Sequence, residues 1–89
     1  MLDTNVWCGH YELDVVARRG GVLVFCEVKS KSGDRFGDPA EMVTAEKQRR
    51  LRMAAEMWLK RHRECAALRI RFDVIVERAG RREHLRDAF

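Results

Sequence analysis

Acidic and basic side chains occupy matching positions in two strand-like segments of this sequence. Glu12 and Asp14 lie in the first segment, and Glu27 and Lys29 lie in the second. If the segments pair around a two-residue turn at Gly20–Gly21, Asp14 lies opposite Glu27 and Glu12 opposite Lys29, with all four side chains on one face. Directly opposed carboxylates, with Cβ atoms about 5 Å apart, repel each other. They therefore require a cation, a raised pKa or full solvation.

This requirement is met if Asp14 and Glu27 hold a divalent metal ion with Lys29 beside it. Carboxylates and a lysine around such an ion are the groups needed for phosphodiester hydrolysis. The metal ion would polarise a phosphate and lower the pKa of an attacking water. The lysine would orient that water or stabilise charge that develops on the phosphorane. The alternative is ordinary strand alternation on a solvated face, since a strand ending in Glu-x-Lys needs no function. The second acid on the partner strand favours the metal-site interpretation.

The elements that must position these residues follow from the hydrophobic pattern. Three segments have the strand formers or the alternation of strands: Tyr11–Arg18, Val22–Lys29 and Arg69–Glu77. A last short strand is expected from His84 to Phe89, after a turn at Gly80. The glycine pair between the first two predicts a tight hairpin in which both turn residues take positive φ. The order strand, strand, helix, strand, strand implies a crossover between parallel second and third strands. The sequence therefore predicts a small α/β fold with a mixed sheet.

Apolar residues at helical spacing predict one main helix, which begins after the N-cap Thr44 and ends near Arg63. A polar loop precedes it, and a short helical turn is expected from Pro39 to Val43. One face of the predicted hairpin is almost wholly apolar and is expected to lie under this helix: Leu13, Val15, Val22, Val24, Cys26 and Val28.

Composition limits the class of protein. The chain has 89 residues, which fits a single domain over 1–89. No apolar run approaches the roughly 20 residues of a membrane-spanning helix, and the start lacks the basic and apolar parts of a signal peptide. We therefore expect a cytoplasmic protein with no membrane partner, whose three cysteines are free thiols. The net charge of +4 permits a nucleic-acid partner without demonstrating one.

Six segments, in order, carry a family resemblance: Tyr11-Glu12-Leu13-Asp14-Val15-Val16, Leu23-Val24-Phe25-Cys26-Glu27-Val28-Lys29, Arg35-Phe36-Gly37-Asp38-Pro39-Ala40-Glu41, Thr44 to Leu51, Arg71-Phe72-Asp73-Val74 and Asp87-Ala88-Phe89. They resemble the YraN family (UPF0102). That family is similar to the restriction-endonuclease-like PD-(D/E)xK nucleases and, among these, to archaeal Holliday-junction resolvases. The implied fold is a small restriction-endonuclease-like sheet with a crossover helix.

The resemblance also implies roles for individual residues. It makes Asp14 and Glu27 ligands of Mg²⁺ (or Mn²⁺), Lys29 the catalytic lysine and Glu12 a supporting acid. Gln48 falls where related nucleases often carry a helix glutamine near the active site, and an exposed helix residue is the equal alternative. Arg71 and Asp73 fit the third strand and are expected to form a structural ion pair. No small-molecule cofactor is implied.

Two departures from the family pattern bear on activity. The family usually begins with a helix whose glutamate completes the acidic set, whereas this sequence starts near the first strand. The sheet face that this helix covers would then be bare or covered by another subunit, and a homodimer is one way to bury it. Tyr11 stands where glycine is usual. Both departures put catalytic competence in question.

Basic residues of the loop and helix are predicted to contact substrate phosphates, with a solvated helix face as the alternative: Lys31, Arg35, Lys47, Arg49, Arg50 and Arg52. The leading functional hypothesis is a metal-dependent endonuclease acting on DNA, with branched or repair intermediates as substrates. The alternative is a non-catalytic nucleic-acid-binding or scaffold protein that keeps the nuclease fold. A third hypothesis is the inactive remnant of a truncated gene.

Overall fold

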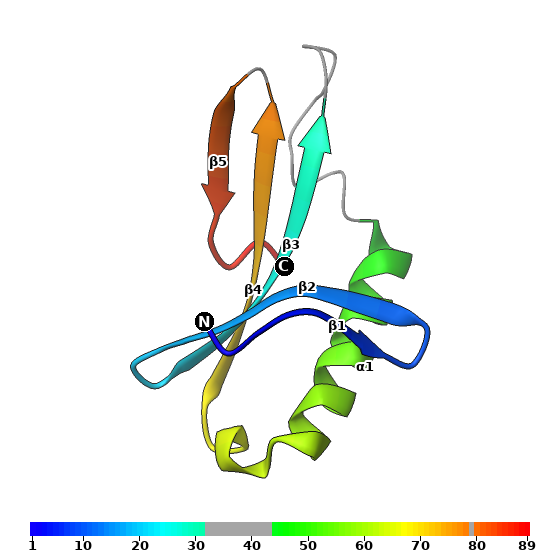
Figure 1. The fold of residues 1–89 in the computed structure, drawn as a ribbon, viewed down its shortest axis with the longest axis vertical. Coiled ribbons are helices and arrows are strands. Elements are labelled where there is room, and N and C mark those ends of the chain that lie inside the picture. The colour runs from blue at the N-terminus through cyan, green and yellow to red at the C-terminus, as the bar shows by residue number, and fades with distance from the viewer. Residues whose placement is uncertain (32–43, 79) are drawn as a thin grey trace.

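In the computed structural model, the chain folds into a mixed sheet with one long helix on one side (Figure 1). The structure describes residues 1–31, 44–78 and 80–89. The described strands follow the order β1-β2-β3-β4-β5 in the sheet, and only β3 and β4 are parallel. The elements are β1 (Asp3–Cys8), β2 (Tyr11–Arg19), β3 (Val22–Lys31), α1 (Ala45–Arg61), the 3₁₀ turn η2 (Arg63–Cys65), β4 (Arg69–Arg78) and β5 (Arg81–Leu85). The predicted α/β class, with a helix connecting adjacent parallel strands, is confirmed. None of the described helices is long and apolar enough to cross a membrane.

The β2–β3 hairpin has the register that the glycine pair predicts. Arg19 pairs with Val22, and the pairing continues in step to Val15 and Cys26. Of the two turn glycines, only Gly20 has a positive φ, of +59°. A turn with positive φ at its first central residue alone still matches the twist of the flanking strands. The hairpin prediction is therefore correct, although only one glycine uses the left-handed region.

Strand β1 was missed by the sequence analysis, and β5 was placed too late. The apolar side chains of β1 that face the core are Val6 and Cys8, whereas Asp3 accepts a hydrogen bond from the Trp58 ring N–H. Asn5 interrupts the strand with a φ of +50°. Such a strand carries little hydrophobic alternation. Strand β5 runs from Arg81 to Leu85 rather than from 84 to 89, because four of its five residues are exposed and no apolar pattern marks it.

Helix α1 begins and ends close to the predicted positions. Its N-cap is Thr44, whose Oγ1 accepts a hydrogen bond of 3.2 Å from the Lys47 N–H. The helix ends at Arg61, and η2 follows after His62. The short helical turn expected from Pro39 to Val43 lies outside the described residues.

Leu13 of β2 lies under the helix as expected, but on β3 the helix covers the face opposite to the expected one. Its buried residues join a core with Leu23 and Phe25 of β3, and the Phe25 ring lies 5.8 Å from Trp58 and 5.7 Å from Phe72. Large rings bury more apolar area than the valines and the cysteine of the other face. Because side chains two apart share a face, Glu27 follows Phe25 on the helix-covered side. The Glu27 side chain, near the end of β3, therefore lies on the same side of the sheet as α1.

Strand β2 changes phase in its middle. Leu13 and Val16 are both buried in the core under α1, although strict alternation would put them on opposite faces. The irregular position lies between them, at Asp14. Asn5 and Asp14 do not pair, although their neighbours on β1 and β2 pair in register. Figure 1 shows the result: the β1–β2 hairpin runs across the direction of β3 and β4. This parting of β2 from β3 creates the candidate site.

Candidate functional site

Asp14 marks the point at which β2 leaves β3. The last recorded pair between the two strands joins Val15 and Cys26. Beyond this pair, the Val28 N–H, two residues after Cys26, donates a hydrogen bond of 2.9 Å to Oδ2 of Asp14, which precedes Val15. The carboxylate thus satisfies a strand donor that the parting of the strands would leave without a ladder partner. It is held against the backbone of β3 next to Glu27.

Glu27 is a buried carboxylate, 7% exposed, with a partner on each oxygen. The Tyr11 hydroxyl donates to Oε2 at 2.9 Å, and Nζ of Lys29 lies 3.1 Å from Oε1. A buried charge needs such compensation, because desolvation is costly. Burial, reinforced by the charge of Glu27, raises the pKa of Tyr11 well above its usual value. The phenol therefore stays protonated and keeps donating to the carboxylate over the whole physiological pH range.

The structure thus brings together three of the predicted residues, Asp14, Glu27 and Lys29, and adds Tyr11. Tyr11 was noted from the sequence only as a departure from the family glycine. No sequence signal identified it, because regular alternation puts Tyr11 and Leu13 on the face opposite to Asp14 and Glu27.

Glu12 does not join this group. It lies between Tyr11 and Leu13, which both pack toward α1, so alternation directs its side chain to the other face of the sheet. Its strand partner there is Trp7, which is 60% exposed. The expectation that all four charged residues share one face is therefore wrong for Glu12. The cause is the phase change of β2 at Asp14, which no alternation rule anticipates.

Gln48 lies half-buried in the first turns of α1, one turn before the buried Leu51. Its position at the edge of the inner helix face, rather than on the outer face, is compatible with the predicted role near the site. The nearby Arg50 carries a charge that acts on Tyr11. The first turns of α1 therefore adjoin the carboxylate group.

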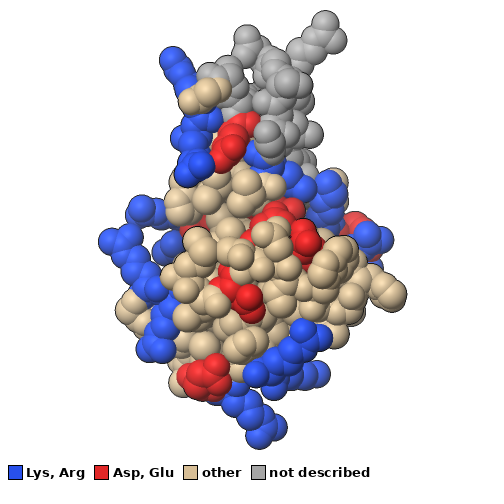
Figure 2. Space-filling view, viewed as in Figure 1, with Lys and Arg blue, Asp and Glu red and all other residues tan. Residues whose placement is uncertain are grey.

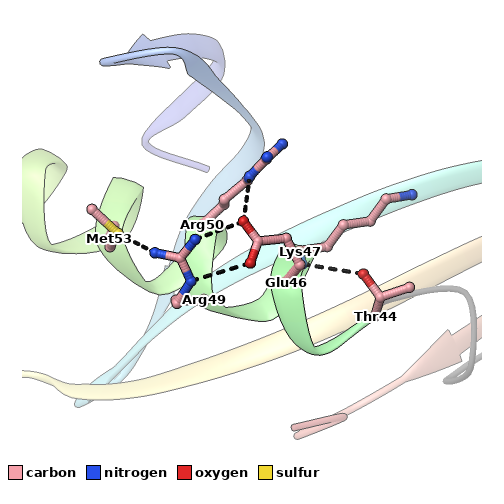
Figure 3. Close-up of polar contacts among 6 residues, drawn as sticks. All are labelled: Thr44, Glu46, Lys47, Arg49, Arg50 and Met53. Atoms are coloured by element: carbon pink, nitrogen blue, oxygen red, sulfur yellow. Dashed lines mark hydrogen bonds and ion pairs between the residues drawn. The ribbon is translucent and has the colours of Figure 1, made fainter.

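The basic residues of α1 do not form a single row. Arg49 and Arg50 converge on Glu46, at 2.6 and 3.0 Å, while Lys47 extends away from them (Figure 3). Arg52 lies on the other flank of the helix, with its guanidinium 4.9 Å from the centre of the Phe72 ring. On the face seen in Figure 2, Lys and Arg side chains lie mostly around the margin. Lys31 is the last residue of β3, and Arg35 lies outside the described residues.

A second polar cluster lies on β4 and β5. Asp73 is completely buried and accepts two hydrogen bonds of 2.9 Å from Arg71, one from Nε and one from Nη2. Nε2 of His84 lies 2.7 Å from the same carboxylate, and the Asp87 N–H donates to it at 2.9 Å. The predicted ion pair between Arg71 and Asp73 is therefore present. It ties the segment after β5 to β4.

The donor set at Asp14 and Glu27 fits a hard cation with few protein ligands. Mg²⁺ is commonly bound through one or two carboxylates and keeps several waters or substrate oxygens. Within residues 1–31, 44–78 and 80–89, no group of three or more His, Cys, Asp or Glu side chains could hold a metal ion. Two carboxylates at the end of a strand are compatible with Mg²⁺ or Mn²⁺.

Two substitutions of Asp14 separate its structural role from its charge. Asp14→Asn keeps an oxygen that can accept from the Val28 N–H, so we expect the free energy of unfolding to stay close to that of the wild type. Asp14→Ala removes the acceptor and should cost about 1 kcal/mol. Both should lose binding of Mn²⁺, because both remove the negative charge. Urea denaturation and metal titration check these results, and equal metal binding by Asp14→Asn and the wild type would contradict them.

Comparison with known proteins identifies relatives over the whole chain. A family model described as "Uncharacterised protein family UPF0102" matches residues 1–76. A UPF0102 protein of Frankia alni is 49% identical over the full chain, which covers 78% of that protein. A UPF0102 protein of Frankia casuarinae is 46% identical, with 79% of its length covered. One of Alkalilimnicola ehrlichii is 39% identical, with 71% of its length covered.

Proposed function

This chain belongs to the UPF0102 family, and we propose that it is a metal-dependent endonuclease that hydrolyses phosphodiester bonds in DNA. The observation that carries the proposal is the group formed where β2 parts from β3. There Asp14 is fixed by the Val28 N–H, and the adjacent Glu27 is held between Tyr11 and Lys29. Two acids and a lysine at one point are the side chains that metal-assisted phosphate chemistry requires.

In this proposal Asp14 and Glu27 hold Mg²⁺ or Mn²⁺, which supplies Lewis-acid polarisation of the phosphate and a water of lowered pKa when bound. The remaining work belongs to the side chains. Lys29 is 22% exposed, so its ammonium can reach a phosphate oxygen while Glu27 holds it in place. It would donate a hydrogen bond to charge that develops on the phosphate. Tyr11 keeps the Glu27 carboxylate in a fixed orientation.

The proposed substrate is DNA, in the form of branched structures or repair intermediates. The chain carries a net charge of +4, and the exposed Lys47, Arg49 and Arg50 lie in the first turns of α1, beside the site. Phosphate contacts of this kind position a strand without reading its sequence. We place the activity in the cytoplasm, where free thiols such as the three buried cysteines stay reduced.

A second candidate is a nucleic-acid-binding protein without catalysis. The observation that favours it is that both oxygens of Glu27 already have partners within the protein, Tyr11 and Lys29. A carboxylate compensated in this way needs no metal ion to balance its charge. The protein would then bind DNA through its basic side chains alone, with an affinity that falls steeply as salt increases.

Cleavage of four DNA substrates separates the two functions. Single-stranded, duplex, flap and four-way DNA are incubated with the protein and Mg²⁺, Mn²⁺ or EDTA. The nuclease proposal predicts cleavage with either metal, none with EDTA, and a preference for a substrate with an unpaired or branched strand. Salt-dependent binding with no cleavage of any substrate would establish the second candidate instead.

A further inference from the structure

A cavity of about 500 Å³ opens between the β1–β2 turn and the first half of α1. This volume lies in the range of sites that take small organic ligands. Its walls include Gly9, Tyr11, Arg49, Arg50, Met53 and Met57. Because Tyr11 lines the cavity and also donates to Glu27, the cavity borders the carboxylate site directly. We name it the β1–α1 cavity.

The walls of the β1–α1 cavity are mostly apolar and contain soft groups. Met53 is 53% exposed and Met57 is 36% exposed, so both thioethers are accessible from the cavity. Gly9 packs against Met57, since a Cβ built at Gly9 would lie 3.4 Å from the Met57 sulfur, an ordinary van der Waals contact. The φ of Gly9, +66°, disfavours other residues. Thioethers and an open slot suit a flat aromatic ligand.

The mouth of the cavity carries an excess of positive charge. Arg49 and Arg50 share a single carboxylate, that of Glu46, so one of the two positive charges is not balanced there (Figure 3). The Arg49 guanidinium also lies against the Met53 sulfur, with Nη1 at 3.6 Å. A guanidinium beside an apolar wall can stack on an aromatic ring and attract an adjacent phosphate. The cavity thus combines an apolar slot with an anion-attracting mouth.

We propose that the β1–α1 cavity binds one unpaired nucleobase of the strand whose phosphate lies at Asp14, Glu27 and Lys29. The link to that phosphate rests on the proposed function, whereas binding of the base does not. A base enters such a slot only when it has left its stack and its partner, since paired bases present only their edges. The substrate class that follows is DNA with a single-stranded part, such as a flap or an open junction.

A binding experiment on the metal-free wild-type protein tests the proposal without any cleavage. Methionine methyl groups are labelled with carbon-13, and deoxyadenosine 5′-monophosphate or deoxyribose 5-phosphate is titrated. We expect the Met53 and Met57 signals to shift with the nucleotide only, while the exposed Met1 serves as internal control. Equal shifts with deoxyribose 5-phosphate, or no shift of Met53 and Met57 at millimolar nucleotide, would overturn the proposal.

A second measurement uses oligonucleotides and two charge-matched variants. A single-stranded oligonucleotide should shift Met57, and the same sequence as a blunt duplex should not. Arg50→Ala should weaken single-strand binding by about tenfold, the loss expected for one base contact. Lys60→Ala, which removes the same charge from an exposed site near the end of α1, should weaken it less than threefold. Equal losses in the two variants would refute a specific cavity.

The two proposals fail in distinguishable ways. A protein that shifts Met57 with the nucleotide but cleaves no DNA retains the base site and loses the nuclease assignment. A protein that cleaves with Mg²⁺ but gives no base-dependent shift retains the nuclease assignment and loses the base site.

Discussion

Replacing Lys29 with alanine is expected to lower the rate of metal-dependent cleavage by about 100- to 1,000-fold, the loss that follows removal of one preorganised donor to developing charge. The Lys29 ammonium lies 3.1 Å from the Glu27 carboxylate, and the lysine side chain as a whole is 22% exposed, so it is fixed by Glu27 and still accessible to a phosphate. Single-turnover cleavage of the preferred substrate at saturating metal measures the effect. DNA binding without metal should change less than threefold, because one phosphate contact contributes little to the total.

The alanine variant needs a structural control, because Glu27 would remain buried with one partner fewer. Circular dichroism and urea denaturation define conditions in which the variant is folded, and cleavage is compared there. Lys29→Arg keeps the charge but not the compact ammonium, and we expect it to recover part of the rate. Lys60→Ala should cleave like the wild type. Cleavage by folded Lys29→Ala within threefold of the wild type would contradict the assigned role.

Asp73→Asn is expected to have the largest effect on stability. Its carboxylate is fully buried and meets Arg71, His84 and the Asp87 N–H. An amide in place of the buried carboxylate weakens the hydrogen bonds from these donors and puts an NH₂ group where an acceptor is needed, which should cost about 2 kcal/mol. Urea denaturation at pH 7 measures this loss. Glu64→Gln, which removes a negative charge from the exposed η2, should stay within about 0.5 kcal/mol of the wild type.

The same network makes stability depend on pH in a defined direction. Burial alone would raise the pKa of Asp73, but the hydrogen bonds from Arg71, from the Asp87 N–H and from His84 outweigh it and lower the pKa below its usual value. The stabilisation is therefore complete above about pH 4, near the pKa of an unfolded aspartate, and is lost as the pH falls through the folded value. The difference in stability between wild type and Asp73→Asn should shrink below pH 4. A difference that stays constant from pH 7 to pH 3 would contradict this.

The parts of the fold that the sequence predicts well depend on local physics. A glycine pair between two alternating segments determines the turn, and the turn determines the register from Arg19 and Val22 to Val15 and Cys26. The apolar spacing of α1 and the capping oxygen of Thr44 likewise depend only on neighbouring residues. The register ends at Val15 and Cys26, one pair before Asp14 and Glu27, and Asp14 instead accepts a hydrogen bond from the Val28 N–H.

The parts that were missed depend on contacts between distant segments. The choice of sheet face under α1 is decided by how Phe25, Trp58 and Phe72 pack together. The sequence pattern favoured the other face of β3, because that face is almost wholly apolar. Glu12 points away from Glu27, and Tyr11 contacts Glu27, because β2 changes phase in its middle. This phase change accompanies the pairing of β2 with β1, which was not predicted. Each of these outcomes requires a tertiary partner that a linear pattern does not contain.

The central claim is that Asp14 and Glu27 together hold one divalent metal ion. Titration of nitrogen-15-labelled protein with Mn²⁺ tests it most directly, because the ion broadens the amide signals nearest to it. We predict that Val28, whose N–H donates to Asp14, and its neighbour Lys29 broaden first, and that Asp14→Asn abolishes this effect while the fold persists. Broadening that begins elsewhere, or that is unchanged in Asp14→Asn, would contradict the claim.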